Sequence, residues 1–164
     1  MPDQITLQRV ARDRREGKSP GTQAGEFVRE EIEHIREGKH GARSAKQAIA
    51  IGLSKARRAG VKLPVPKKGT VSASTRRKAQ SDSAAATHKP SRTRQRATLS
   101  ALKREGHAAA SHIALSRQAH SAASKRSSAS RSAAARKAAR TKGPAKRTAA
   151  ARKAARTRRN EHRA

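Results

Sequence analysis

The chain contains no cysteine, tryptophan or tyrosine, and its only phenylalanine is Phe27. Without thiols it can form no disulfide framework, thiolate metal site or cysteine nucleophile. With one aromatic side chain it lacks the stacking platforms by which proteins hold single-stranded bases. We therefore expect Phe27 in a hydrophobic core, and we expect no sequence-specific recognition of single strands.

Large apolar residues are also scarce. Only 18 of the 164 residues are Val, Ile, Leu or Phe, well below the ~20% under which a highly charged chain is expected to stay largely disordered. Most of the remaining apolar residues are alanines, 35 of them, and alanine favours helices while burying little surface. This composition excludes a single globular core that spans the whole chain.

Membrane, catalytic and metal-binding signals are missing as well. No apolar run approaches the roughly 18 residues of a membrane span, and the N-terminal residues lack the order of a secretory signal, so we expect a cytoplasmic protein without a membrane partner. The serines have no identifiable base and orienting acid, so we expect no enzyme, no catalytic residue and no cofactor. The densest histidines, His107, His112 and His120, share no helical face and no carboxylate cluster, so we expect no metal site.

Positive charge, by contrast, is abundant. The chain has 41 Lys and Arg against 11 Asp and Glu, a formal net charge of +30. Residues 1–66 hold 14 bases, 8 acids and 13 of the large apolar residues, whereas residues 67–164 hold 27 bases and 3 acids. Prolines and a glycine between Pro64 and Gly69 would stop a helix at this boundary. The pattern predicts a helical head over 1–66, a Ser/Ala/Lys/Arg-rich linker over 67–127 and a basic repeat tail over 128–164.

Helical periodicity predicts three short helices in the head, at about residues 3–15, 21–37 and 44–59. Ser44 and Gln47 fit a capping box at the start of the third. Ala48 and Gly52 would let a partner helix approach closely. With so small a core, the alternative is that these helices are only marginally stable and become ordered when they bind a partner. The predicted core residues are Val28, Ile32, Ile35, Ile49 and Leu53.

Carboxylates are concentrated on the second predicted helix. Four of them lie close together in the sequence: Glu30, Glu31, Glu33 and Glu37. We expect these four on the solvated face, paired with Arg29, Arg36 or the basic tail.

The tail contains a repeat. Residues 132–141 recur as residues 148–157 with nine of ten positions identical, and Gly143-Pro144 lies between the copies. Because this pair breaks a helix, we expect two short Ala-rich helical segments joined by a hinge. Arg136 and Arg140 repel at i and i+4, so we expect the tail to be largely disordered and to gain helix when phosphates neutralise it. The predicted fold class is therefore mostly α, with a two- or three-helix head and a disordered basic tail.

The charge points to a polyanionic partner. Lys and Arg on a flexible chain contact phosphates and do not hold a register over base edges, so we expect sequence-independent DNA binding by a histone-like, nucleoid-associated protein. RNA or ribosome association is one alternative, and a protein-interaction or self-associating head tethered by the tail is another. The predicted nucleic-acid-binding residues are Arg131, Arg136, Lys137, Arg140, Arg147, Arg152, Lys153, Arg156, Arg158 and Arg159.

One segment resembles a known family. Residues 41–64 include the run K-Q-A-I-A-I-G-L-S-K-A-R at residues 46–57, and this run closely resembles the signature of a family of small, basic bacterial proteins of unknown function. That resemblance implies no activity and no catalytic residues. Separately, the tail is similar in composition to the Ala/Lys-rich arms of linker-histone-like bacterial proteins, which implies DNA coating and compaction.

Overall fold

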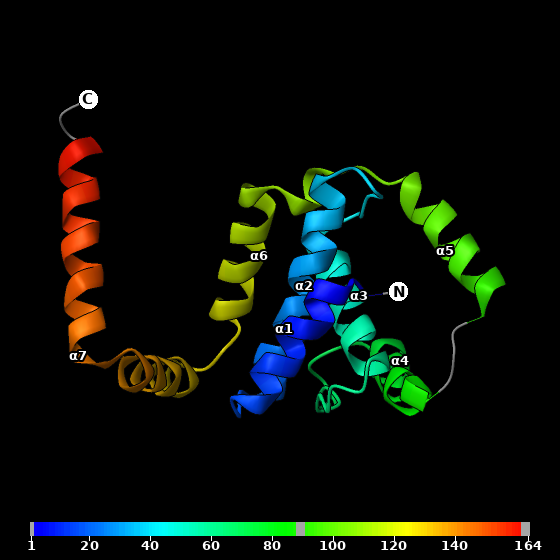
Figure 1. The fold of residues 1–164 in the computed structure, drawn as a ribbon, viewed down its shortest axis with the longest axis horizontal. Helices are drawn as coiled ribbons and strands as arrows, with labels where there is room; N and C mark the ends of the chain where they lie inside the picture. Colours follow the sequence, from blue (N-terminus) through cyan, green and yellow to red (C-terminus); the bar gives the residue numbers. More distant parts are fainter. Residues whose placement is uncertain (1, 88–90, 162–164) are drawn as a thin grey trace. The chain divides into compact units, whose positions relative to one another are not determined.

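The computed structural model describes residues 2–87 and 91–161 and is built from helices (Figure 1). The chain divides into two compact units, Met1–Gln118 and Ala119–Ala164. Seven α-helices and two short 3-10 helices make up the described parts: α1 Gln4–Arg15, α2 Pro20–Arg36, α3 Ala45–Arg58, α4 Ala73–Ala84, η1 Ala85–Thr87, α5 Arg92–Lys103, η2 Ala108–Ala110, α6 His112–Ser124 and α7 Ser128–Glu161.

The first three helices begin and end within two residues of the ranges expected from periodicity. At the start of α3 the backbone N–H of Gln47 donates to Ser44 Oγ at 3.2 Å. The Gln47 side chain accepts from the backbone N–H of Arg43 at 2.9 Å, one residue before the position that a capping box uses. Local signals therefore place this helix start correctly, with a small change in the reciprocal bond.

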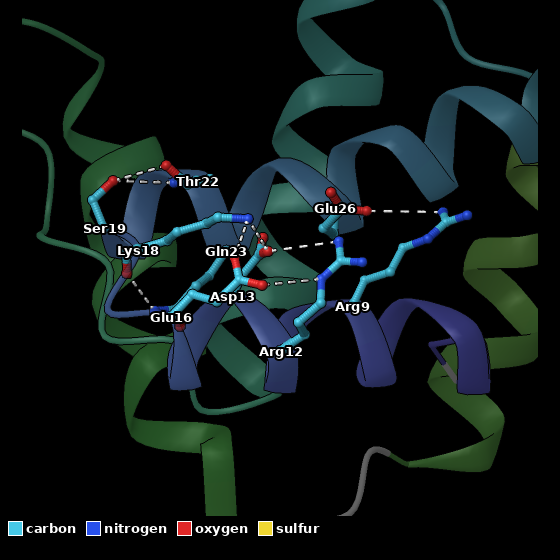
Figure 2. A network of polar contacts seen from close by, with 9 residues as sticks. All are labelled: Arg9, Arg12, Asp13, Glu16, Lys18, Ser19, Thr22, Gln23 and Glu26. Atoms are coloured by element: carbon cyan, nitrogen blue, oxygen red, sulfur yellow. Dashed lines mark hydrogen bonds and ion pairs between the residues drawn. The ribbon is translucent and has the colours of Figure 1, made fainter. Parts of the chain in front are cut away.

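A polar network holds α1 against α2 where the chain turns between them (Figure 2). The Asp13 carboxylate is 2% exposed and contacts Lys18 Nζ at 2.8 Å. Gln23 Nε2 donates to the Lys18 carbonyl at 2.8 Å, and Arg9 lies 3.8 Å from Glu26. Helix α1 has few apolar residues. Charged groups therefore supply much of its contact with α2.

Two hydrophobic clusters form the core of this unit. Phe27 is fully buried in one of them, as its rarity suggested, together with Ala24, Ala56 and Val61. The other joins α2 and α3 to η2: Ile32, Ile35, Ala42, Ala48, Ala109 and Ala110. Of the predicted core residues, Ile32 and Ile35 are buried, Val28 and Leu53 pack against the clusters, and Ile49 is half-buried.

Helices α2 and α3 come into backbone contact at Gly52. A Cβ atom at this position would lie 2.6 Å from the Cα of Val28 and 2.9 Å from its nitrogen. Ala48, one turn earlier, is fully buried. Small residues on α3 therefore permit the close approach that the sequence predicted.

The prediction of a largely disordered tail is wrong, because the described residues beyond Lys67 form α4, α5, α6 and α7. Serine explains part of the error. A serine stands directly before each of these helices. Its Oγ accepts from the backbone N–H three residues later at 3.2 to 3.5 Å, which satisfies a free donor at the start of the helix. The capping serines are Ser72, Ser91, Ser111 and Ser127.

Buried polar contacts explain why the first unit extends past the predicted head. Asp82 of α4 is 1% exposed and accepts from Ser54 Oγ at 2.7 Å. Its carboxylate also accepts from Arg58 Nε and Lys78 Nζ, both at 2.9 Å. One acid therefore attaches α4 to α3, although α4 has almost no apolar side chains to bury.

Backbone pairing attaches the segment around residues 102–110. Gly41 N–H donates to the carbonyl of Leu102 at 2.9 Å, and Ala42 N–H donates to that of Gly106 at 3.0 Å. Alanines of η2 then fill the core cluster. The expectation of disorder counted only large apolar residues. It did not foresee this docking, because alanines and backbone hydrogen bonds make much of the contact.

Helix α7 is interrupted at Gly143, whose φ of 67° and ψ of 167° are not helical, and Pro144 follows. The break lies where the hinge was predicted. Because the backbone on both sides is helical, residues 128–161 consist of two helical arms and not of disordered chain.

Candidate nucleic-acid interface

The predicted nucleic-acid-binding residues all lie on α7, the second unit's long interrupted helix. Each of the ten is exposed. Because the bases and alanines do not separate into a polar and an apolar face, α7 has no apolar stripe to bury against another element. The first arm contains Arg131, Arg136, Lys137 and Arg140; the second contains Arg147, Arg152, Lys153, Arg156, Arg158 and Arg159.

The repeat gives the two arms the same local arrangement. In the first arm Arg136 and Arg140 are one turn apart and so project from one side of the helix. Arg152 and Arg156 stand in the same relation in the second. Each arm therefore presents a ridge of guanidinium groups, spaced about 6 Å apart along the helix axis.

Few acidic side chains remain to neutralise these bases. All ten acids from Asp3 to Glu105 lie within 3.9 Å of a basic nitrogen in the unit Met1–Gln118. Beyond Glu105 the sequence has 16 bases and one acid, Glu161. Neutralising charge for α7 must therefore come mostly from outside the chain.

A second polar site lies inside the first unit, and sequence reasoning misplaced its residues. Glu30 is 3% exposed and Glu31 is fully buried, so the expectation that Glu30, Glu31, Glu33 and Glu37 all lie on a solvated face is wrong. Only the outer two behave like surface acids: Glu33 pairs with Arg29 at 2.9 Å, and Glu37 pairs with Lys39 at 2.9 Å.

Lys55 of α3 lies against both buried carboxylates. Its Nζ is 2.6 Å from Glu31 Oε2 and 3.2 Å from Glu30 Oε1. Burial lowers the pKa of Lys55, but the hydrogen bond and charge of Glu31 and the charge of Glu30 outweigh it and raise that pKa above its ordinary 10.5. Lys55 is therefore a stable cation, half-buried against the two carboxylates.

Two histidines complete this cluster. His34 Nε2 lies 2.9 Å from Asp3 Oδ2, and this bond lowers the pKa of Asp3. The Asp3 backbone N–H donates to Glu30 Oε2 at 3.0 Å. His40 is buried in the loop after α2, and its Nε2 lies 3.3 Å from Glu31 Oε1.

A sequence signal for this cluster exists. Glu31 and His34 stand at i and i+3 on a helix, the spacing at which bundle proteins place metal-ligating Glu and His side chains on one side. His40 carries no comparable signal, because only the loop between α2 and α3 returns it to Glu31. The histidines considered from the sequence, His107, His112 and His120, are all exposed.

None of the helices in residues 2–87 and 91–161 is long and apolar enough to cross a membrane.

Comparison with known proteins identifies one similarity. Residues 15–68 match a family of unknown function (DUF6496). No curated protein and no solved structure gives a significant match. The matched segment holds α2, α3, the run at 46–57 and every cluster residue except Asp3, but none of α7. About a third of the chain is thus similar to an uncharacterised family, and the matched range includes the cluster residues other than Asp3 but not the basic helix.

Proposed function

We propose that this protein binds duplex DNA without regard to sequence, as a histone-like, nucleoid-associated protein, by laying the two arms of α7 along phosphates. The observation that carries the proposal is the charge of α7. The ten predicted bases on α7 are exposed, and each acid of the first 105 residues lies within 3.9 Å of a basic nitrogen in its own unit. A polyanion supplies the missing negative charge, and release of its counterions drives binding.

Helical arms suit a duplex in length. The arm before Gly143 has 15 residues and would span about 22 Å, roughly the rise of six to seven base pairs. The hinge at Gly143-Pro144 lets each arm follow its own stretch of backbone. Because the arms are already helical, binding does not have to supply the free energy of ordering them.

RNA is the principal alternative polyanion, since phosphate contacts alone do not separate it from DNA. Competition of labelled duplex DNA with ribosomal RNA at physiological salt distinguishes the two. Displacement of the duplex by a much lower nucleotide concentration of RNA would favour ribosome or RNA association. The other reading, a protein-binding first unit that the tail tethers to the nucleoid, has no specific contact in its favour.

The experiment is a salt titration of duplex binding by the full chain. If α7 engages about 6 to 10 phosphates, affinity falls roughly 10³- to 10⁵-fold between 50 and 200 mM salt. The test variant changes four ridge residues to Gln: Arg136, Arg140, Arg152 and Arg156. The control variant removes the same charge from exposed bases that pair with acids of the first unit: Arg12, Arg29, Lys39 and Arg43.

The test variant should reduce the slope of log affinity against log salt by about 3.6, that is 0.9 for each lost phosphate contact. The control should keep the wild-type slope, because its bases are not on α7. Equal losses in both variants would mean that net charge alone acts, and an unchanged slope in the test variant would overturn the assignment to α7.

A further inference from the structure

The buried cluster of the first unit does not balance its charge. Glu30 and Glu31 are buried there, whereas the Asp3 side chain is about half-exposed; among the described residues, the ammonium that contacts the two buried carboxylates is that of Lys55. The nearby Lys39 pairs with Glu37 and reaches Asp3 only through longer-range attraction. Lys55 balances one of the two buried carboxylates, so one buried negative charge is left, and buried charge is costly unless it is compensated.

Hydrogen bonding at His40 locates the deficit. His40 Nδ1 lies 3.1 Å from the carbonyl oxygen of Gly41, which can only accept, so Nδ1 carries the proton. In the neutral ring, Nε2 is then a lone-pair acceptor, and it faces Glu31 Oε1 at 3.3 Å. That oxygen is buried and accepts no hydrogen bond from any residue in the described parts of the chain. Positive charge between the two atoms resolves this contact: either a second proton on Nε2, which then donates to Oε1, or a metal ion that both atoms ligate.

The spacing fits a metal ion. In a tetrahedral site with bonds of about 2.0 to 2.1 Å, two ligand atoms lie about 3.4 Å apart, close to the separation of His40 Nε2 and Glu31 Oε1. His34 places a ligand atom within 4.8 Å of those of Glu31 and His40. Its Nε2 is held by Asp3, the carboxylate-imidazole contact that typically orients ligating histidines.

The neighbouring group of Asp3, Glu30 and His34 is a poorer set of ligands, although its ligand atoms also lie within 4.8 Å of one another. Glu30 Oε2 already accepts from the Asp3 backbone and Oε1 from Lys55. Lys55 Nζ also contacts Oε2 of Glu31, so Oε1 is the oxygen of that carboxylate that is left to bind a metal ion.

We propose that Glu31, His34 and His40 bind a divalent cation of the zinc class, with water as the fourth ligand. Two imidazoles and one carboxylate suit zinc and related transition ions better than magnesium or calcium. The positive charge of the ion would compensate the buried carboxylate charge that Lys55 leaves unbalanced. Because His40 lies beside Gly41 and Ala42, bound metal would also fasten the loop that holds residues 102–106.

The test adds ZnCl2 to the full-length, chelator-treated protein and follows the ring nitrogens of all histidines by NMR. We expect one equivalent to shift the signals of His34 and His40 and to leave those of the exposed His107, His112 and His120 unchanged. Shifts confined to the exposed histidines, or no saturable shift, would overturn the proposal. This measurement needs no variant and is independent of folding defects.

Calorimetry with variants provides the second readout. His40→Gln and Glu31→Gln should weaken zinc binding by at least about 100-fold, since changes even in residues that only orient ligands cost 10- to 100-fold. The matched controls, His112→Gln and Glu33→Gln, alter an exposed histidine and a surface acid and should bind as wild type. Equal zinc affinity in the folded cluster variants and the controls would refute the site.

Discussion

At the scale of single residues, the contact between α2 and α3 depends on the missing side chain of Gly52. A Cβ there meets backbone atoms of Val28, which cannot rotate away as a flexible side chain could. We expect Gly52→Ala to lower the free energy of unfolding by about 2 to 3 kcal/mol through overpacking. Chemical denaturation followed by circular dichroism measures it.

Gly25 of the same pair of helices provides the control. It lies within α2, and a Cβ there would have no atom within 4 Å. Gly25→Ala should raise stability by about 0.5 to 1 kcal/mol, because alanine is the better helix former. Similar effects of the two substitutions would contradict the backbone contact at Gly52.

Asp82 makes a second prediction at this scale. Burial alone would raise the pKa of Asp82, but hydrogen bonds from Ser54, Lys78 and Arg58 lower it below its ordinary 3.8. We expect Asp82→Asn to cost about 1.5 to 3 kcal/mol at neutral pH, the range for hydrogen bonds to charged groups, and to loosen α4 first. Amide hydrogen exchange across α4 and thermal unfolding measure the two effects.

The pH dependence of that cost follows from the lowered pKa of Asp82. A carboxylate with a lower pKa in the folded state contributes its full stability above its unfolded value, near pH 3.8, and loses it as the pH falls through the folded value. The stability difference between wild type and Asp82→Asn should therefore be constant at neutral pH and shrink below about pH 3.8. A difference that persists undiminished in strong acid would show that the Asp82 charge is not responsible.

At the scale of elements, the break in α7 rests on two adjacent residues. Gly143 has a positive φ, and Pro144 lacks the N–H of a helix interior. Replacing both with alanine should join the arms into one helix of about 51 Å and raise its thermal stability. We expect no gain of more than about tenfold in duplex affinity, or roughly 1.4 kcal/mol, because the charge is unchanged and a straight rod no longer follows the backbone.

Circular dichroism and fluorescence anisotropy on a short duplex check these two statements. Pro66→Ala, outside α7, serves as a control for the removal of a proline. A large gain in affinity on straightening α7 would show that a continuous ridge binds better than two separately docking arms.

At the scale of the whole molecule, the basic unit and the unit that contains the buried cluster have separate chemistry. Binding through α7 involves phosphates, and α7 presents no aromatic side chain to bases. Random and A/T-rich duplexes should therefore differ by less than about tenfold in affinity, far below the ~10³ that marks specific binders. Quantitative competition at fixed salt tests this, and a preferred site bound more than 10³-fold above random DNA would reveal a base reader elsewhere in the chain.

The sequence alone determined the features that depend on neighbours along the chain. Helical periodicity, Ser44 at a cap and the Gly143-Pro144 break act over a few residues, so the three head helices and the division of α7 could be predicted. The segregation of charge follows from composition, and so does the exposure of α7, which has no apolar stripe to bury.

Only the tertiary structure decided where the acids lie and how far the folded unit extends. Glu31 looks like a surface acid in its own helix, and its burial depends on Lys55 from α3 and on His40 from a loop. Asp82 similarly holds α4 through partners on α3. Burial of charge is a property of the residues that surround it in space, and those contacts join positions that no local pattern connects.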